Sequence, residues 1–267
     1  MNITTANFEE IRKWETIEVE RSASEAQKRE TEDLRLAEKT IRRYLSPPED
    51  TPYQLEYAYH LLGDVKGKTV LDYGCGAGEN SVLIASHGAE RVVGVDISPE
   101  LVELGMRRLA LHGFAAQAEL KVGSAHELPL EAESVDVVFG MAILHHLDLQ
   151  LASEEVFRVL KKGGRAIFLE PVRNSRLVKF VRNLIPYEAP DISPFERPLT
   201  DAELEKFAAR FSKYRDRAFS IPFVNLVNVL GLSENLLHRA IKLDGKILKS
   251  APFLKNYASV RVVEMTK

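Results

Sequence analysis

An apolar run that ends in an acid and leads into a glycine loop is the feature that most constrains this chain. The apolar residues 69–71 precede Asp72, and the loop 74–78 carries glycine at every second position, before a further apolar segment at 81–86. Glycine lets the backbone turn sharply and approach a ligand closely. The first turn of a helix offers unpaired N–H groups to polar ligand atoms. The order therefore predicts a strand, a tight loop and a helix that form a binding site together.

A second acid, Asp96, ends the next apolar run, residues 91–95. An acid about 20 residues beyond such a loop commonly binds the ribose hydroxyls of an adenosine cofactor. The dinucleotide fingerprint is incomplete, because Glu79 stands where its last glycine belongs, and no phosphate-loop Gly-Lys-Ser/Thr follows. The carboxylate of Asp72 suits a cationic ligand group better than a pyrophosphate. S-adenosylmethionine, which carries an ammonium and a sulfonium, is the adenosine cofactor that these features favour.

Five segments, in order, resemble the motifs of class I S-adenosylmethionine-dependent methyltransferases. They are the glycine loop 72–78, the ribose-binding segment 93–98, the adenine loop 123–129, the fourth strand with its turn at 135–147, and the turn 158–164 before strand five. One glycine loop would be weak evidence, but ordered motifs support one another. The resemblance covers residues 67–171. It implies an α/β fold with a Rossmann-like doubly wound sheet of about seven strands, mostly parallel with an antiparallel last strand.

The resemblance also implies which residues hold the cofactor. Asp72 would lie near the methionine moiety, Asp96 would accept both ribose hydroxyls, and Ile97 would pack on the adenine. The only cysteine, Cys75, would contact the cofactor through its backbone, since no base stands beside it in sequence. The full expected set is Asp72, Gly74, Cys75, Gly76, Asn80, Asp96, Ile97, Ser124, Ala125, His126 and Met141. No metal ligand set is expected.

The adenine loop departs from the family pattern at Ser124. The family usually has an acid at this position, which accepts a hydrogen bond from the adenine amino group. A serine hydroxyl can also accept a hydrogen bond, and the neighbouring polar side chains His126 and Glu127 could assist. A weaker cofactor affinity is the other expectation.

Two adjacent histidines, His145 and His146, are the candidates for a general base. They follow strand four at the mouth of the expected pocket, and a histidine titrates near neutral pH. A structural role, or a contact to the cofactor, is the alternative for both. The residues that could contact the substrate are Tyr44, Tyr57, Glu170, Arg182 and Arg197; for Glu170, a bond to nearby backbone or arginine is equally compatible with the sequence.

Alternating patterns predict strands near 68–72, 91–95, 118–122, 135–139, 165–169, 215–220 and 259–264. Helices are predicted within 8–46, near 53–62, 79–87, 98–112 and 151–160, from 199–204 onward, and over 222–250. Ser98 is the expected N-cap of the helix near 98–112, and Thr200 or Asp201 is the expected N-cap of the helix that starts at 199–204. We expect four regions: an N-terminal helical cap (1–62), the cofactor-binding core (63–171), lid insertions around strand six (172–256) and the last core strand (257–267). A solvated arm is the alternative for residues 15–35.

A formal net charge of −3 gives no basic bias toward nucleic acid, and the Asn/Asp-Pro-Pro-Tyr/Phe tetrapeptide of adenine- and glutamine-methylating enzymes is absent. We expect no nucleic-acid partner, a small-molecule acceptor and a cytoplasmic location, since no spanning run or signal segment is visible. The basic residues 239–249 allow contact with a membrane surface, although a solvated face is more usual. O-methylation is the favoured activity; a non-methylating cyclisation or lyase step, or a non-enzymatic partner subunit, are the alternatives.

Overall fold

A seven-stranded sheet forms the centre of the computed structural model, which describes residues 8–29, 33–175, 196–221, 224, 227, 231 and 233–267. The strand order is β3-β2-β1-β4-β5-β7-β6, and β7 runs antiparallel to the other six strands. The predicted Rossmann-like sheet with an antiparallel last strand is thereby confirmed. The strands are β1 (Thr69–Tyr73), β2 (Arg91–Asp96), β3 (Ala118–Val122), β4 (Val135–Met141), β5 (Leu160–Pro171), β6 (Lys213–Phe219) and β7 (Val260–Thr266).

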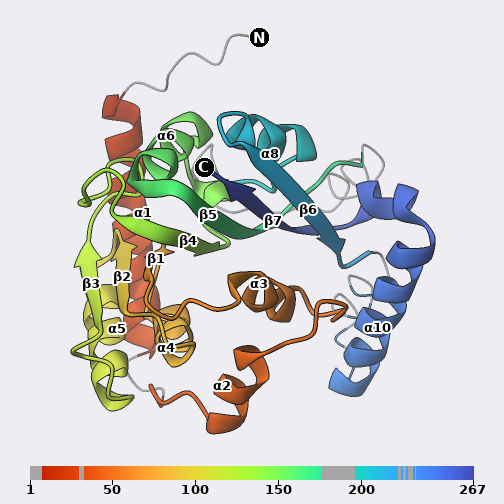
Figure 1. The fold of residues 1–267 in the computed structure, drawn as a ribbon, viewed down its shortest axis with the longest axis horizontal. Helices are drawn as coiled ribbons and strands as arrows, with labels where there is room; N and C mark the ends of the chain where they lie inside the picture. The colour runs from red at the N-terminus through yellow and green to blue at the C-terminus, as the bar shows by residue number, and fades with distance from the viewer. Residues whose placement is uncertain are drawn as a thin grey trace.

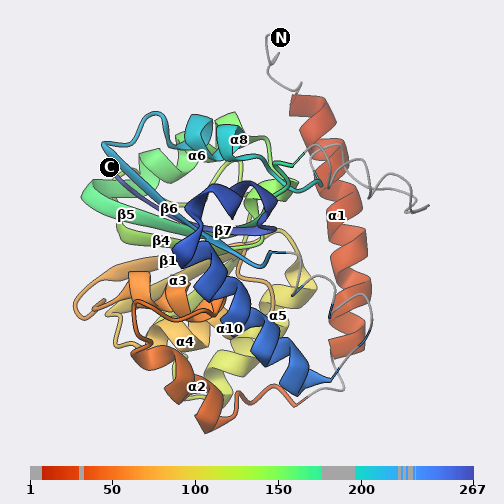
Figure 2. The same cartoon turned by 90° about the vertical axis from the view of Figure 1, so that its right-hand side faces the viewer.

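Helices cover both faces of the sheet (Figure 1). Helices α3, α4 and α5 lie on one face, and α6 and α8 lie on the other, while α1 crosses one end of the sheet (Figure 2). The helices are α1 (Phe8–Arg29), α2 (Glu38–Leu45), α3 (Gln54–Leu62), α4 (Glu79–Ser86), α5 (Pro99–Leu111), α6 (Leu149–Val159), α8 (Asp201–Ala208) and α10 (Glu234–Ser250), with the 3-10 turns η1 (Leu144–His146) and η2 (Pro252–Tyr257).

Burial on both faces explains why the central strands are apolar throughout. Val70 and Leu71 are adjacent on β1 and are both fully buried, yet they belong to the cores on opposite faces of the sheet. Side chains alternate between the faces of a strand, so a parallel strand covered on both sides needs apolar residues at successive positions. The same arrangement brings the carboxyl ends of β1, β2 and β4 to one edge of the sheet, where ligands bind in such folds.

Local signals place the helix starts as predicted. The Ser98 hydroxyl accepts a hydrogen bond from the Leu101 N–H at 3.2 Å, with proline in the first turn of α5. At α8, Thr200 is the N-cap and forms a reciprocal capping box with Glu203. Each cap satisfies N–H groups that have no partner inside the helix. Both caps fix where the chain enters the helix, and of the two candidates at α8 it is Thr200 that holds the position.

Helices at the two ends of the chain, α1, α2 and α10, lie outside the alternating strands and helices of the core. The charged N-terminal stretch forms two helices, α1 and α2, separated by an extended segment. Helix α10 packs beside β6 and buries Ala240 and Asp244, while its basic side chains, Arg239, Lys242, Lys246 and Lys249, are exposed. Throughout the described residues, every helix is too short or too polar to cross a lipid bilayer.

Candidate cofactor and acceptor site

A cavity of about 510 Å³ opens at the carboxyl ends of β1, β2 and β4, and residues of α1 form part of its wall. Figure 2 shows α1 lying across this end of the sheet. Its wall combines the glycine loop, the ends of β2 and β4, the loop after β3 and the turn η1. Most of the residues predicted to bind the cofactor line it: Gly74, Cys75, Gly76, Asn80, Asp96, Ile97, Ala125, His126 and Met141. The topology thus brings distant motifs into one cavity.

The glycine loop is held in a conformation that side chains disfavour. Gly74, Gly76 and Gly78 have φ of +75°, +48° and +77°, in the left-handed region. A Cβ on Gly74 would lie 2.8 Å from Ile143, whereas a Cβ on Gly76 would meet no protein atom within 4 Å. Gly74 therefore permits a close approach within the protein, and Gly76 leaves room for a ligand against the backbone.

Asp96 fastens the glycine loop to the end of β2. Its Oδ2 accepts from the Gly76 N–H at 2.8 Å, and its Oδ1 accepts from the Ser98 N–H at 3.0 Å. Burial raises the pKa of Asp96, and these backbone bonds oppose that rise. Each carboxylate oxygen has a further lone pair, so the side chain can accept two ribose hydroxyls. The acid, the cradle at Gly76 and the loop after β3 fit an adenosine cofactor.

Asp72 is buried at the end of β1 and does not belong to the cavity lining. Its Oδ2 accepts from the Ser81 hydroxyl at 2.6 Å, and its Oδ1 has no hydrogen-bond partner within the described part of the chain. Burial raises the pKa of Asp72 to about 7, and the charge of Asp96 adds to the rise. A cation bound at the glycine loop would stabilise this carboxylate, as the sequence interpretation requires.

Two further residues of the glycine loop region have clear partners. Burial raises the pKa of the Cys75 thiol well above its ordinary value, which disfavours the reactive thiolate. The Asn80 Oδ1 accepts from the Tyr59 hydroxyl at 2.7 Å, which fixes its orientation on the cavity wall. Cys75 is therefore suited to packing and backbone contact, not to nucleophilic chemistry.

The sequence predicts a helical cap over residues 1–62 but identifies no residue of α1 as part of the site. Six residues of α1 line the cavity: Ile11, Trp14, Glu15, Glu18, Ser22 and Arg29. Ala26 packs with Ala77, Leu101 and Leu104 in a small core of its own, so α1 is docked on the cofactor side of the fold. Ile11 and Trp14 are three residues apart on one face of an otherwise charged helix. That spacing is the signal that favours a covering helix over a solvated arm.

The two histidines lie on η1 with their ring centroids 4.1 Å apart. His146 lines the cavity, and its Nδ1 is buried without a hydrogen-bond partner among the described residues. Burial lowers the pKa of His146 to about 4, and the neighbouring His145 contributes. The imidazole of His146 is therefore neutral at physiological pH.

Glu170 holds the turn that carries the histidines. It is fully buried at the end of β5, and its Oε1 accepts from the backbone N–H groups of Ile143 and Leu144, each at 2.9 Å. Its Oε2 lies 3.0 Å from the Nδ1 of His145. Glu170 and His145 do not line the cavity. This carboxylate therefore positions η1, on which the cavity-facing His146 sits.

The remaining residues predicted to contact substrate have other partners. The ring of Tyr44 lies 5.1 Å from that of Tyr59, and Tyr57 packs at 5.6 Å against Phe219. Arg197 pairs with Glu203 at the start of α8. None of these residues lines the cavity, and Arg182 lies outside the described residues. Of the described residues in the predicted lid, 172–256, none lines the cavity either.

A charged cluster lies at the end of the cavity beside η1, which is named the acceptor end because it carries the histidine predicted as the general base. Ligand-type atoms of Glu18, His146 and Glu196 lie within 4.8 Å of one another. Arg21 donates to Glu18 at 2.9 Å and to Glu196 at 2.5 Å. Since one guanidinium already bridges both carboxylates, the arrangement is an ion-pair network that ties α1 to the segment before α8.

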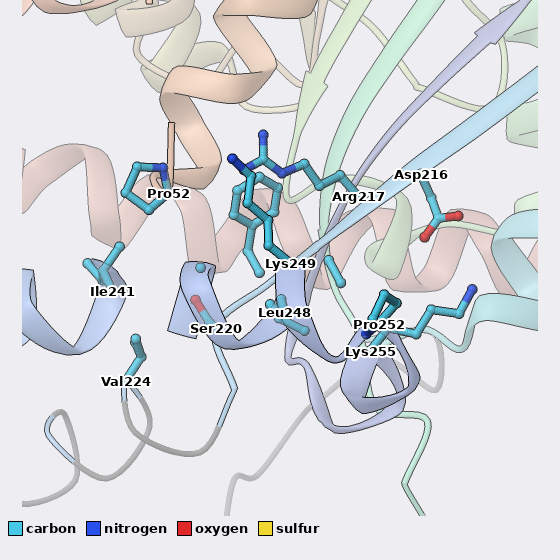
Figure 3. A pocket seen from close by; sticks show the side chains of 13 residues that line it. Pro52, Asp216, Arg217, Ser220, Val224, Ile241, Leu248, Lys249, Pro252 and Lys255 are labelled. Carbon is cyan, nitrogen blue, oxygen red and sulfur yellow. The ribbon is translucent and has the colours of Figure 1, made fainter. Parts of the chain in front are cut away.

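A second cavity, of about 280 Å³, lies between β6, α10 and Pro52 (Figure 3). Arg217, one of the basic residues that line it, donates to the carbonyl oxygens of Glu49 and Thr51 at 2.5 and 2.7 Å. None of the residues predicted for the site lines it. This second cavity lies between α10 and the edge of the sheet, away from the glycine loop.

Comparison with known proteins agrees with this geometry. Residues 71–168 match the family model described as a methyltransferase domain. The chain is 36% identical to the demethylmenaquinone methyltransferase of Symbiobacterium thermophilum over 43% of its own length and 47% of that protein. It is 31% identical to the ubiquinone biosynthesis O-methyltransferase of Coxiella burnetii over 59% of its length and 68% of that protein.

The fold is also that of a solved methyltransferase. The geranyl diphosphate C-methyltransferase of Streptomyces coelicolor superposes with a TM-score of 0.56 at 19% identity, over 78% of each chain. The fold and the site thus define a binding domain for an adenosine cofactor. The chain belongs to the class I S-adenosylmethionine-dependent methyltransferases. The S. thermophilum match spans about half of that relative, so the acceptor is inferred from this chain's own residues.

Proposed function

We propose that this chain transfers a methyl group from S-adenosylmethionine to an oxygen atom of a small hydroxylated acceptor. The observation that carries the proposal is His146, which lines the cofactor cavity and whose buried Nδ1 has no hydrogen-bond partner among the residues that the structure describes. A hydroxyl must lose its proton as it is methylated, and a neutral imidazole within reach can accept it. The name of the C. burnetii relative, an O-methyltransferase, supports the same chemistry.

The cavity combines apolar side chains with the charged cluster beside His146. Met141, Ile143 and Leu147 line the cavity from the sheet side, Ile11 and Trp14 line it from α1, and Glu18 of α1 lies next to the histidine. An apolar pocket with few polar groups binds flat hydrophobic molecules and orients them by those groups. Phenols and quinols, which join a flat apolar ring to one or two hydroxyls, match this combination of an apolar wall and a small polar cluster.

The protein's part in the reaction is positioning and proton removal. When bound, S-adenosylmethionine supplies an electrophilic methyl group on a sulfonium. His146 would accept the proton that the acceptor hydroxyl loses as its oxygen is methylated. Glu170 keeps η1 in place through the Ile143 and Leu144 N–H groups. Helix α1 excludes water from the cavity, which strengthens the electrostatic interactions inside.

An acceptor screen with product analysis tests the proposal. Phenols, quinols and sugars are incubated with S-adenosylmethionine and the full chain, and both products are identified by mass spectrometry and NMR. We expect S-adenosylhomocysteine and an O-methyl product in equal amounts. A product methylated on carbon would contradict the oxygen assignment. Conversion of the acceptor with S-adenosylhomocysteine in place of the methyl donor would favour a cyclisation or lyase step instead. No turnover of any acceptor would favour a partner subunit.

A further inference from the structure

Helix α1 brings a carboxylate to the position where the adenine loop lacks one. The loop has Ser124 in place of the family's acid. In the folded chain, the Ser124 hydroxyl donates to the Oε1 of Glu15 at 2.5 Å, and the His126 Nδ1 lies 3.0 Å from the same oxygen. Glu15 lines the cavity beside Ala125 and His126. An acid 109 residues earlier in the chain thus lies at the adenine loop.

The surrounding bonds orient this carboxylate and keep it charged. The Asp148 N–H donates to the Nε2 of His126 at 3.0 Å, so that nitrogen is unprotonated and the Nδ1–H donates to Glu15. Burial raises the pKa of Glu15, but the hydrogen bonds from His126 and Ser124 outweigh it and leave the pKa below its ordinary value. Both bonds end on Oε1. Within the described part of the chain, Oε2 accepts no hydrogen bond and is available to a ligand.

We infer that Glu15 is the residue that recognises the adenine amino group of the cofactor. Its Oε2 accepts a hydrogen bond from the 6-amino group, in place of the acid that the loop lacks. The inference rests on the proposed cofactor site and adds a specificity residue to it. It also makes α1 part of the binding site: the helix that covers the cavity contacts the cofactor, so bound cofactor and docked helix stabilise each other.

A purely structural role for Glu15 is the competing explanation, since its two bonds also attach α1 to the loop. Glu15→Gln separates the two. The glutamine carbonyl can replace Oε1 and keep both bonds from Ser124 and His126. Its NH₂ group then takes the place of Oε2, where it donates instead of accepting. The 6-amino group of an adenine ligand then has no acceptor at this position. A ligand with a 6-oxo group in place of the amino group can accept a hydrogen bond from the glutamine NH₂.

The experiment is calorimetric binding of S-adenosylhomocysteine and of S-inosylhomocysteine, which carries a 6-oxo group, to the full chain. We expect the wild type to prefer the adenosine ligand by about 10- to 100-fold, the range for one hydrogen bond to a charged group. We expect Glu15→Gln to reverse that preference, and Glu15→Ala to bring the ratio of the two affinities close to one. Glu10→Gln, an exposed glutamate on the same helix, is the matched control and should keep the wild-type ratio.

The docking of α1 can be followed in the same samples. Trp14 is the only tryptophan of the chain and lines the cavity next to Glu15. Its fluorescence should change on ligand addition in the wild type and in Glu15→Gln, because the helix remains docked in both. A wild-type preference retained by Glu15→Gln would overturn the role of Glu15 alone. Failure of the wild type to bind either ligand would overturn the proposed cofactor site as well.

Discussion

The two ends of the cavity are built from different parts of the chain. At the adenosine end, the loops and strand ends between Gly74 and His126 supply most of the wall, and hydrogen bonds such as that from Gly76 to Asp96 hold it together. At the acceptor end, η1 lies beside α1, although the two are more than 100 residues apart in sequence. An ion pair from Arg21 of α1 to Glu196 lies next to them. One βαβ unit therefore supplies the ribose contact, whereas the acceptor site and the adenine contact inferred for Glu15 depend on tertiary contacts.

Replacing Asp96 should weaken binding at the adenosine end of the cavity, and this is the largest effect that we expect. Asp96→Ala removes the carboxylate proposed to hold both ribose hydroxyls, together with its bonds from Gly76 and Ser98. Two hydrogen bonds to a charged group correspond to a loss of affinity of about 10²- to 10⁴-fold. Calorimetric titration with S-adenosylhomocysteine measures it. Glu90→Gln, an exposed acid before the opposite end of β2, is the control; equal affinities for both variants would contradict the assignment of Asp96.

Replacing His146 should reduce turnover at the acceptor end of the cavity and leave cofactor binding at the adenosine end unchanged. For His146→Ala we expect turnover to fall by about 10²- to 10³-fold, the lower part of the range for general bases, because its low pKa makes this imidazole a weak base. The affinity for S-adenosylhomocysteine should be unchanged. His238→Ala, an exposed histidine on α10, is the matched control.

The pH dependence of turnover sharpens the same assignment. His146 must be neutral to accept a proton, and its pKa is lowered to about 4. The wild-type rate should therefore stay level from pH 8 to about 5 and fall only at lower pH. A rate that halves near pH 6.5 would indicate a base with an ordinary histidine pKa and would contradict the role of His146.

Asp72 should make the unliganded protein less stable as the pH rises. Its pKa is about 7 in the folded chain against an ordinary 3.8, so between these values the folded state holds a proton that the unfolded state has lost. Stability is lost as the pH rises through this window, by roughly 3 kcal/mol between pH 5 and 8.

Asp72→Asn removes this titration and provides the test. Its melting temperature relative to the wild type should increase by roughly 6 °C between pH 5 and 8, since about 2 °C corresponds to 1 kcal/mol in a chain of this size. Thermal unfolding in the two buffers measures the difference. An offset between the two proteins that does not vary with pH would show that Asp72 is not protonated in the folded chain.

Thr200 lies outside the cavity and should give the smallest effect. Thr200→Ala removes the N-cap of α8 and should cost about 1 kcal/mol of stability, a shift of roughly 2–4 °C in melting temperature. Cofactor affinity should not change. A loss of affinity would show that α8 is coupled to the cavity, in line with the lid predicted for residues 172–256.

How far sequence reasoning reached depends on how far apart in sequence the contacting residues lie. The roles of Ser98 and Thr200 as caps, and the position of Asp96 at the cavity, depend on neighbours within a few residues or within one βαβ unit. Glu15 could not be predicted, because its contact to Ser124 spans 109 residues and a glutamate in a charged helix looks solvated. The aromatic rings of Tyr44 and Tyr57, predicted for the pocket, pack on Tyr59 and Phe219 instead.

The most direct test of the site is calorimetric titration of the full chain with S-adenosylhomocysteine, with NAD as the control ligand. The incomplete dinucleotide fingerprint at Glu79 and the carboxylate of Asp72, which suits a cationic group better than a pyrophosphate, favour the former ligand. We expect one molecule of S-adenosylhomocysteine to bind per chain, with a change in Trp14 fluorescence, and no binding of NAD. Binding of NAD alone, or of neither ligand, would contradict the assignment of this cavity as the cofactor site.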